Sequence, residues 1–355
     1  MCSSCSLLVQ LNPKFMSQLS KKIIKWHKEY GRKNLPWQRD TNPYKVWISE
    51  IMLQQTQVNT VIPYYQRFIE RFPDIEALAN STEEEVLSYW SGLGYYSRGR
   101  NIFKSARLLK EQFNCSMPSS LDLLESLPGV GRSTAGAICS LGFKKQAAIL
   151  DGNAKRLLVR YFCIEETIDS SKTINKLWEI AEAQVPAKDC NVYTQAIMDV
   201  GSLICKRTNP QCEECPLEDD CLSKQQGMQT LLPNRSPKKR KPLKKVYWML
   251  IQNEREEILL ENRNSKGIWE GLWSFPEFKK KAERQDYIES LKEDYELIEK
   301  DIKLKHSFSH YDLDIDLMSL KVSKMHNLEN NKAWFGTRDI MKVGIPAPVS
   351  KIKKV

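Results

Sequence analysis

Four cysteines close together in the middle of the chain constrain its fold more than any other feature. They read C-x6-C-x2-C-x5-C within seventeen residues: Cys205, Cys212, Cys215 and Cys221. Four thiolates so near in sequence can surround one metal centre without ligands from elsewhere. A structural zinc site usually offers two short cysteine pairs, whereas this run has one short pair between wider gaps. The spacing therefore favours one 4Fe–4S cluster, with zinc as the alternative.

Length and composition narrow the class of protein. A chain of 355 residues has room for two or three domains, and 41% hydrophobic residues suffice for packed cores. No segment approaches the roughly 20 consecutive apolar residues of a membrane helix. Residues 1–5 lack a basic segment followed by a long apolar one, so we expect no secretory signal. Ten cysteines, four of them clustered, indicate a reducing compartment and metal binding rather than a disulfide framework.

The charge of the chain points to an anionic partner. The net charge is +10 and the pI is about 9.0, which favours nucleic acid first. Positive charge is densest at residues 235–245, RSPKKRKPLKK, where seven of eleven residues are basic. Such a run cannot bury an apolar face, so it predicts a solvated linker. A strap that contacts phosphates is the alternative.

The hydrophobic period changes across this basic run. Before it, apolar residues such as Leu19 and Ile23 recur every three or four positions, which predicts amphipathic helices. After it, short apolar runs at 246–251 and 258–260 suit strands. At 312–317 aspartate alternates with leucine or isoleucine, which predicts a strand with one face in water. The sequence therefore predicts a helical region followed by a separate α+β domain.

A second motif, LPGVGRSTAG at 127–136, joins two short predicted helices. Gly129 and Gly131 flank Val130, and glycine permits the backbone conformations that bring N–H groups close to a ligand. With the N-terminus of the following helix, these amides could hold one DNA phosphate. The pattern indicates a helix-hairpin-helix, with an ordinary two-glycine turn as the alternative.

Two carboxyl groups stand out in the helical region. Glu50 interrupts an apolar helix in PYKVWISEIMLQQTQV at 43–58. If it is buried beside aromatic residues, its pKa rises and it becomes a competent acid near neutral pH. Asp151 follows the hairpin in LDGN, where Asn153 could begin a helix over 154–161. An ion-pairing Glu50 and a helix-capping Asp151 are the structural alternatives.

Together these motifs resemble the adenine DNA glycosylase (MutY) family. The resemblance covers about residues 14–225 and rests on seven segments: PW at 36–37, the run 43–58, GLGYYSRGRN at 92–101, the hairpin, LDGNAKR at 150–156, QAIMDVG at 195–201 and the four cysteines. It implies a mainly α helix-hairpin-helix glycosylase region joined to an α+β Nudix-like domain. The implied boundaries are 14–228 for the glycosylase region (six-helix barrel about 36–145; cluster domain 14–35 plus 146–228), 229–245 for the linker and 246–355 for the Nudix-like domain.

Members of this family flip adenine mispaired with 8-oxoguanine or G out of the duplex and remove it in base excision repair. By resemblance, Glu50 protonates adenine and Asp151 stabilises the sugar cation, with Asn153 as its polar neighbour. Trp37 and Gln195 resemble adenine-pocket residues. The other residues expected to contact DNA are Gln55, Thr56, Tyr95, Gly129, Val130, Gly131, Ser133 and Lys155.

Ser133 stands where the related endonuclease III enzymes carry a lysine nucleophile. Without that amine no Schiff base is expected there, so the resemblance implies a monofunctional glycosylase. Lys155 lies near the site in the family and could form adventitious adducts. An endonuclease III-like lyase is disfavoured by Ser133. A non-catalytic DNA-binding protein is disfavoured because Glu50 and Asp151 are intact.

The last domain resembles the lesion-recognition domain of the family through WEGLWSFP at 269–276 and through Phe308, Ser309 and His310. In the family this Phe-Ser-His loop reads 8-oxoguanine; a surface histidine is the alternative for His310. The segment after Pro276 lacks the glutamate-rich helix of a Nudix hydrolase, so no pyrophosphatase activity is expected. The resemblance further implies a cytoplasmic, nucleoid-associated bacterial monomer that binds duplex DNA with A:8-oxoguanine or A:G mispairs, without a membrane partner.

Overall fold

The computed structural model describes residues 13–237, 240–263, 267–291, 295–323, 328 and 331–352. Residues 1–12, where no secretory signal is expected, lie outside this part, as do Lys238 and Lys239 of the basic run. The described residues include no helix that is long and apolar enough to span a membrane. The chain divides into two compact units: Met1–Ala79 with Lys104–Pro237, and Asn80–Phe103 with Lys238–Val355.

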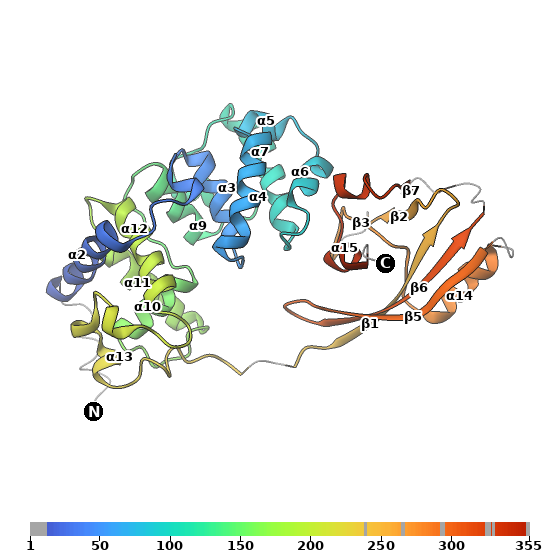
Figure 1. Cartoon of the computed structure of the whole chain (residues 1–355). Helices are drawn as coiled ribbons and strands as arrows, with labels where there is room; N and C mark the ends of the chain where they lie inside the picture. Colours follow the sequence, from blue (N-terminus) through green and yellow to red (C-terminus); the bar gives the residue numbers. More distant parts are fainter. Residues whose placement is uncertain are drawn as a thin grey trace. The chain divides into compact units, whose positions relative to one another are not determined.

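The first unit is helical (Figure 1). Its helices are α2 (Pro13–Tyr30), α3 (Pro43–Leu53), α4 (Val58–Arg71), α5 (Ile75–Ala79), the C-terminal part of α7 (Ser97–Phe113), α8 (Leu121–Glu125), α9 (Arg132–Ala137), α10 (Gly152–Tyr161), α11 (Ser171–Gln184), α12 (Cys190–Asp199) and α13 (Leu222–Gln225). Short helical turns lie between them: η1 (Pro36–Gln38), η2 (Ile138–Gly142), η3 (Val200–Ile204), η4 (Cys212–Glu214) and η5 (Glu218–Asp220).

Apolar stripes on these helices meet in one core. Leu19 and Ile23 of α2 are fully buried against α10, α11 and α12, as their spacing predicts. Leu158 of α10 and Ile197 of α12 lie in the same cluster. This core fixes the start of α10 and the end of α12, which both carry residues of the candidate site.

The second unit combines α6 (Glu83–Trp90) and the start of α7 with a mixed sheet. Its other elements are β1 (Leu243–Gln252), β2 (Ile258–Asn262), β3 (Trp273–Ser274), β4 (Glu277–Phe278), α14 (Lys281–Ser290), β5 (Tyr295–Ser307), β6 (Asp312–Val322), β7 (Lys332–Phe335), η6 (Ile340–Lys342) and α15 (Ala347–Ile352). The sheet order is β3-β2-β1-β6-β5, with β4 paired to β1 and β7 to β2; β1 and β6 are parallel and the other pairs antiparallel. Ile288 of α14 packs into the apolar cluster on the sheet.

The predicted strand at 312–317 forms, but its polar face is not wholly in water. Asp312 and Asp314 are half-exposed, whereas Asp316 is only 4% exposed. The prediction was wrong for Asp316 because β6 lies between β1 and β5, and two cations compensate the carboxylate. Arg284 Nη1 lies 3.1 Å and Lys303 Nζ 2.5 Å from its oxygens.

The basic run enters the sheet earlier than its composition suggests. Strand β1 begins at Leu243 and pairs with β6 from its first residue. Lys241 Nζ donates to the carbonyl oxygen of Phe308 at 2.5 Å, and Lys244 Nζ lies 4.4 Å from the ring of Tyr311. Lys241, Lys244 and Lys245 are exposed, and the last three residues of the run lie in β1.

Candidate active site

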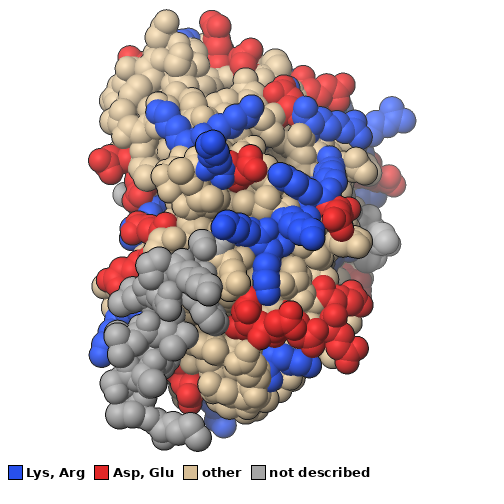
Figure 2. All heavy atoms as spheres, turned by 90° about the vertical axis from the view of Figure 1, so that its left-hand side faces the viewer, with Lys and Arg blue, Asp and Glu red and all other residues tan. Residues whose placement is uncertain are grey.

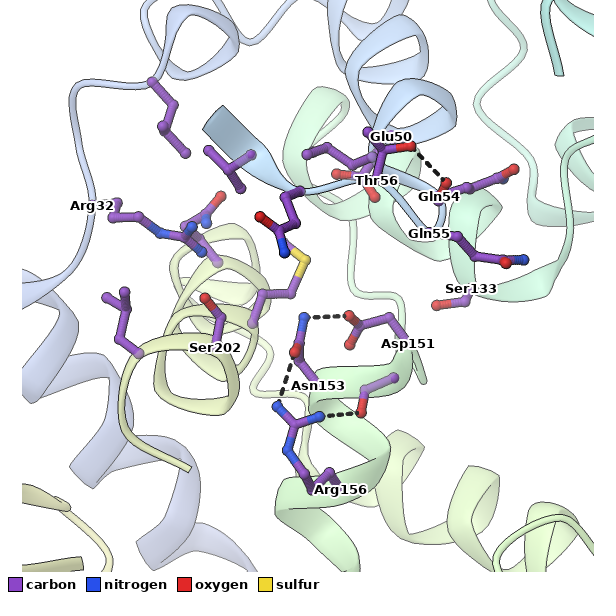
Figure 3. A pocket seen from close by; sticks show the side chains of 18 of the residues that line it. Arg32, Glu50, Gln54, Gln55, Thr56, Ser133, Asp151, Asn153, Arg156 and Ser202 are labelled. Atoms are coloured by element: carbon purple, nitrogen blue, oxygen red, sulfur yellow. Dashed lines mark hydrogen bonds between the residues drawn. The ribbon is translucent and has the colours of Figure 1, made fainter. Parts of the chain in front are cut away.

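One cavity in the first unit gathers most of the predicted site residues. Its volume is about 940 Å³, and its walls come from η1, α3, the loop before α4, α9, α10, α12 and η3 (Figure 3). The predicted residues that line it are Trp37, Glu50, Gln55, Thr56, Ser133, Asp151, Asn153 and Gln195. Lys155 and the glycines of the hairpin are not among its lining residues.

Glu50 of α3 lines this cavity and is half-buried. Its neighbours on the helix, Ser49 and Ile51, are buried at 1% exposure each. Desolvation by burial, and secondarily the charge of Asp151, raise the pKa of Glu50 from 4.5 to about 7. A carboxyl group in this environment carries a proton that it can donate near neutral pH.

Asp151 both caps a helix and lines the cavity. Its Oδ1 accepts a hydrogen bond from the backbone N–H of Ala154 at 2.8 Å, and its Oδ2 accepts one from Asn153 Nδ2 at 2.9 Å. The helix therefore begins at Gly152 with Asp151 as its cap, two residues before the predicted start. The amides at a helix N-terminus favour a negative charge, and here the charge faces the cavity.

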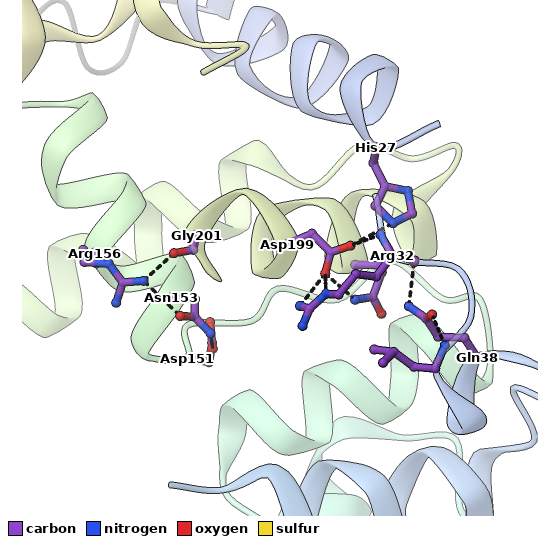
Figure 4. A network of polar contacts seen from close by, with 10 residues as sticks. His27, Arg32, Gln38, Asp151, Asn153, Arg156, Asp199 and Gly201 are labelled. Carbon is purple, nitrogen blue, oxygen red and sulfur yellow. Dashed lines mark hydrogen bonds and ion pairs between the residues drawn. The ribbon is translucent and has the colours of Figure 1, made fainter. Parts of the chain in front are cut away.

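Hydrogen bonds connect Asp151 through Asn153 and Arg156 with Gly201 (Figure 4), and Arg156 also bonds to the cysteine segment. Arg156 Nη2 donates to Asn153 Oδ1 at 3.0 Å, and its Nε donates to the carbonyl oxygen of Cys205 at 2.7 Å. The same Nη2 also donates to the carbonyl oxygen of Gly201. Arg156 thereby fixes the amide that holds the carboxylate of Asp151.

The predicted hairpin lies between α8 and α9. Gly129 has a φ of 78°, and both Gly129 and Gly131 are exposed. A Cβ added at Gly131 would meet open space. The side chain of Val130, by contrast, is only 5% exposed. Ser133 Oγ accepts a hydrogen bond from the backbone N–H of Leu150 at 3.1 Å. The hairpin thus presents backbone to a ligand, and its serine braces the segment that leads to Asp151.

Two of the residues expected to contact DNA have strained backbones. Gln55 in the first unit has a φ of 57° and Tyr95 in the second a φ of 50°, both in the left-handed region. Tyr95 is 48% exposed, and the guanidinium carbon of Arg98 lies 5.2 Å from its ring. Left-handed conformations of non-glycine residues often mark functional positions.

The four clustered cysteines line one small cavity of about 30 Å³ together with Arg160. Arg160 is 2% exposed, and its Nη1 lies 3.4 Å from Cys205 Sγ. Burial raises the pKa of Cys215 to about 12 and that of Cys221 to about 11, so the charge of a bound metal has to stabilise the thiolates. The four cysteines therefore lie around one space, as the ligands of one metal centre must.

The Phe-Ser-His loop of the second unit has one half-buried residue, Phe308, followed by two exposed ones. The ring of Phe308 packs 5.1 Å from Trp269 and 4.8 Å from Tyr311, centroid to centroid. Ser309 and His310 are exposed, with Ser309 Oγ 3.3 Å from His310 Nδ1. The serine and the histidine are thus the groups of this loop that a ligand can reach.

Three sequence profiles match parts of the chain. Residues 48–183 match the HhH-GPD superfamily of base excision DNA repair proteins. Residues 205–221 match the iron-sulfur binding domain of endonuclease III, and residues 247–355 match the NUDIX domain.

Whole-chain similarity decides the family. The adenine DNA glycosylase of Buchnera aphidicola subsp. Baizongia pistaciae is 43% identical over 333 residues, covering 93% of this chain and 94% of that protein. The chain belongs to the adenine DNA glycosylase family. The rat adenine DNA glycosylase is 33% identical over 72% of this chain and 59% of that protein.

Solved structures share the fold of the helical part. A thermostable thymine-DNA glycosylase superposes with a TM-score of 0.55 at 27% identity, covering 60% of this chain and 98% of that one. An endonuclease III bound non-covalently to DNA gives a TM-score of 0.53 at 23% identity, over 61% and 99% of the two chains. Both the predicted helix-hairpin-helix region and the Nudix-like second domain are therefore confirmed. The match at residues 205–221 supports an iron–sulfur cluster in this family member.

Two residues that organise the site were not predicted from the sequence, although both lie in segments that carry the family resemblance. Arg156 ends LDGNAKR, and Asp199 lies in QAIMDVG. Asp199 is 0% exposed and binds Arg32, which lines the cavity. The sequence feature that could have identified Asp199 is an aspartate at the otherwise apolar end of a helix, because a buried carboxylate requires a partner.

Proposed function

We propose that this family member excises adenine mispaired with 8-oxoguanine or G by hydrolysing its N-glycosidic bond. The observation that carries the proposal is the pair of carboxyl groups in one cavity. Burial raises the pKa of Glu50 to about 7, so Glu50 can hold a proton, while Asp151 keeps its oxygens in hydrogen bonds to Ala154 and Asn153. Two carboxyl groups in different environments are what acid-assisted glycosidic cleavage needs.

In this mechanism the adenine is flipped into the cavity against Trp37, which is 6% exposed. Glu50 donates its proton to a ring nitrogen of adenine as the bond from C1′ to N9 breaks and its electron pair passes to the base. Asp151 stabilises the positive charge that remains on the sugar. Water then adds to C1′, and its proton returns to the Glu50 carboxylate.

Ser133 supports hydrolysis without strand cleavage. Its hydroxyl accepts a hydrogen bond from Leu150, and it has no amine with which to form a Schiff base. We therefore propose a monofunctional glycosylase, with Lys155 as the residue that could form minor adducts. The protein would act as a cytoplasmic, nucleoid-associated monomer.

DNA contacts in this proposal come from several elements. In the first unit the hairpin amides at Gly129 to Gly131 hold a phosphate, and Gln55 with Thr56 fills the space of the flipped base. In the second unit Tyr95 serves as a wedge, and Ser309 with His310 reads 8-oxoguanine. Lysine and arginine side chains gather near the centre of the face in Figure 2, in keeping with the net charge of +10.

One 4Fe–4S cluster would occupy the cysteine site, held by Cys205, Cys212, Cys215 and Cys221. When bound, such a cluster supplies a fixed scaffold of iron and sulfide that orders the loop around it. Arg160 would donate to the sulfur of Cys205 and hold the loop through the carbonyl oxygens of Lys206 and Leu232.

The test is excision from duplexes that carry A opposite 8-oxoguanine, A opposite G, or thymine glycol, each assayed with and without alkali. We expect adenine release from the first two duplexes and strand breaks only after alkali. Cleavage of the thymine glycol duplex without alkali would instead indicate an endonuclease III-like lyase. Tight binding with no base release from any duplex would indicate a non-catalytic DNA-binding protein.

A further inference from the structure

Asp199, the last residue of α12, does not itself line the cavity but binds Arg32, which does (Figure 4). Arg32 gives it three hydrogen bonds: from the backbone N–H to Oδ2 at 2.8 Å, from Nε to Oδ1 at 2.9 Å and from Nη2 to Oδ1 at 2.6 Å. His27 Nε2 lies 3.4 Å from Oδ2. Burial favours the neutral acid, but the contact with His27 and the hydrogen bonds from Arg32 outweigh it and lower the pKa of Asp199. The group is therefore a carboxylate, which can only accept hydrogen bonds.

This carboxylate also determines how the amide of Gln195 is turned. Gln195 Nε2 donates to Asp199 Oδ1 at 3.0 Å. Because a carboxylate has no proton to give, the amide must turn its nitrogen toward Asp199 and its oxygen away. Gln195 lines the cavity and Asp199 does not. The amide atom left for a ligand is consequently Oε1, a hydrogen-bond acceptor.

We propose that Asp199 is a positioning residue that selects the excised base by holding Gln195 Oε1 as a fixed acceptor in the cavity. The inference rests on the proposed function, because it assumes that adenine enters this cavity. The exocyclic amino group is the hydrogen-bond donor of a flipped adenine. Hypoxanthine and guanine carry a carbonyl oxygen at that position, and two facing acceptors leave both groups unpaired.

The Asp199 carboxylate also stabilises a second side of the cavity. The experiment therefore has to distinguish an effect on Gln195 from an effect on that side. The carbonyl oxygen of Arg32 accepts from Gln38 Nε2 at 2.9 Å, and Gln38 Oε1 accepts from the backbone N–H of Leu35 at 3.1 Å. Asp199 thereby ties down the segment that carries Leu35 and Trp37, which form an apolar side of the cavity. A change at Asp199 that acted only through this segment would slow the excision of every base alike.

The readout is the ratio of single-turnover excision rates for adenine and for hypoxanthine, each opposite the same 8-oxoguanine. Gln195→Leu removes the acceptor and should lower this ratio by about 5- to 150-fold, the usual effect of one base contact. Asp199→Asn should lower it in the same direction, because an asparagine NH₂ can donate to Gln195 Oε1 and let the amide turn. In the double variant the second change should lower the ratio no further, since both act through one group. His27→Gln alters only the contact at Oδ2 and should keep the parent ratio.

Gln195→Glu tests the same point with Asp199 intact. The new carboxyl group has to share a proton with Asp199 and still presents an oxygen to the cavity, so we expect a ratio within a few-fold of the parent. This variant tests the need for an acceptor at position 195 even if Asp199→Asn does not fold.

Three results would overturn the inference while leaving the proposed function standing. The first is an equal fall of both rates in Asp199→Asn with an unchanged ratio, which makes Asp199 purely structural. The second is a further fall of the ratio when Asp199→Asn is added to Gln195→Leu, which places the effect in the segment of Leu35 and Trp37. The third is a Gln195→Glu ratio as low as that of Gln195→Leu. A parent chain that releases no adenine would instead overturn the proposed function itself.

Discussion

Replacing Glu50 by glutamine should stabilise the fold and abolish excision. Both effects follow from the burial of the carboxyl group, because burial makes its ionised form costly and keeps on it the proton that it donates. Desolvation and the charge of Asp151 raise the pKa of Glu50 from 4.5 to about 7. That difference is about 2.5 units, and each unit corresponds to about 1.4 kcal/mol. Ionising Glu50 therefore costs about 3 kcal/mol more in the folded chain than in the unfolded chain.

The sign of the pH dependence follows from the raised pKa. The folded state holds this proton more tightly than the unfolded state, so its contribution to stability is complete below pH 4.5 and is lost as the pH rises through about 7. Glutamine carries no charge and keeps that contribution. Between about pH 5.5 and about pH 8, the advantage of Glu50→Gln in the free energy of unfolding should grow by about 2 kcal/mol. Urea unfolding followed by tryptophan fluorescence measures this free energy. The control variant is Glu76→Gln, which removes the same charge from an exposed position of α5.

The excision rate of Glu50→Gln should fall, whereas its stability should rise. In the parent, the single-turnover rate should fall as the pH rises through about 7, because Glu50 loses the proton that it donates. Glu50→Gln should be slower by at least about 10²-fold and flat over this range, with unchanged affinity for duplex DNA. The reasoning is refuted by a variant that excises adenine within a few-fold of the parent, or by a stability difference that does not change with pH.

Three further outcomes follow from the site and the two units. Asp151→Asn should lose excision with little loss of DNA affinity, because an amide cannot stabilise the sugar cation; adenine release and binding measured on one duplex check this. Cys212→Ser should lose iron and the broad absorption near about 400 nm expected of the cluster, and weaken DNA binding; retention of the parent iron content contradicts it. Alanine at Phe308, Ser309 and His310 together should cut the preference for A opposite 8-oxoguanine over A opposite G by about 5- to 150-fold, and an unchanged preference places the lesion reader elsewhere.

The sequence predicted those parts of the fold and site that depend on neighbouring residues. The helical stripe of Leu19 and Ile23, the hairpin around Gly129 and the four-cysteine run are local patterns, and the structure and the family profiles bear them out. Local spacing also placed Asp151 beside a helix start, although the helix begins at Gly152.

Contacts between distant segments could not be read from the same patterns. Asp316 follows the alternation of a half-exposed strand, yet Arg284 from α14 and Lys303 from β5 bury its carboxylate. Asp199 and Arg32 are 167 residues apart, so no periodicity relates them. A buried ion pair of this kind depends on tertiary packing, which single-sequence spacing does not encode.

The separation of Arg32 and Asp199 also has a consequence during synthesis of the protein. At about 5 to 20 residues per second, a ribosome needs roughly 10 to 30 seconds to add the 167 residues that separate these partners. Throughout that interval the nascent chain carries α2 without α12, so the core around Leu19 and Ile23 lacks the apolar side chains of α12. The contacts of Arg32 and Gln195 with Asp199 cannot form until α12 has been made. The cysteine segment begins only six residues after Asp199, so α12 and the iron–sulfur site emerge from the ribosome almost together.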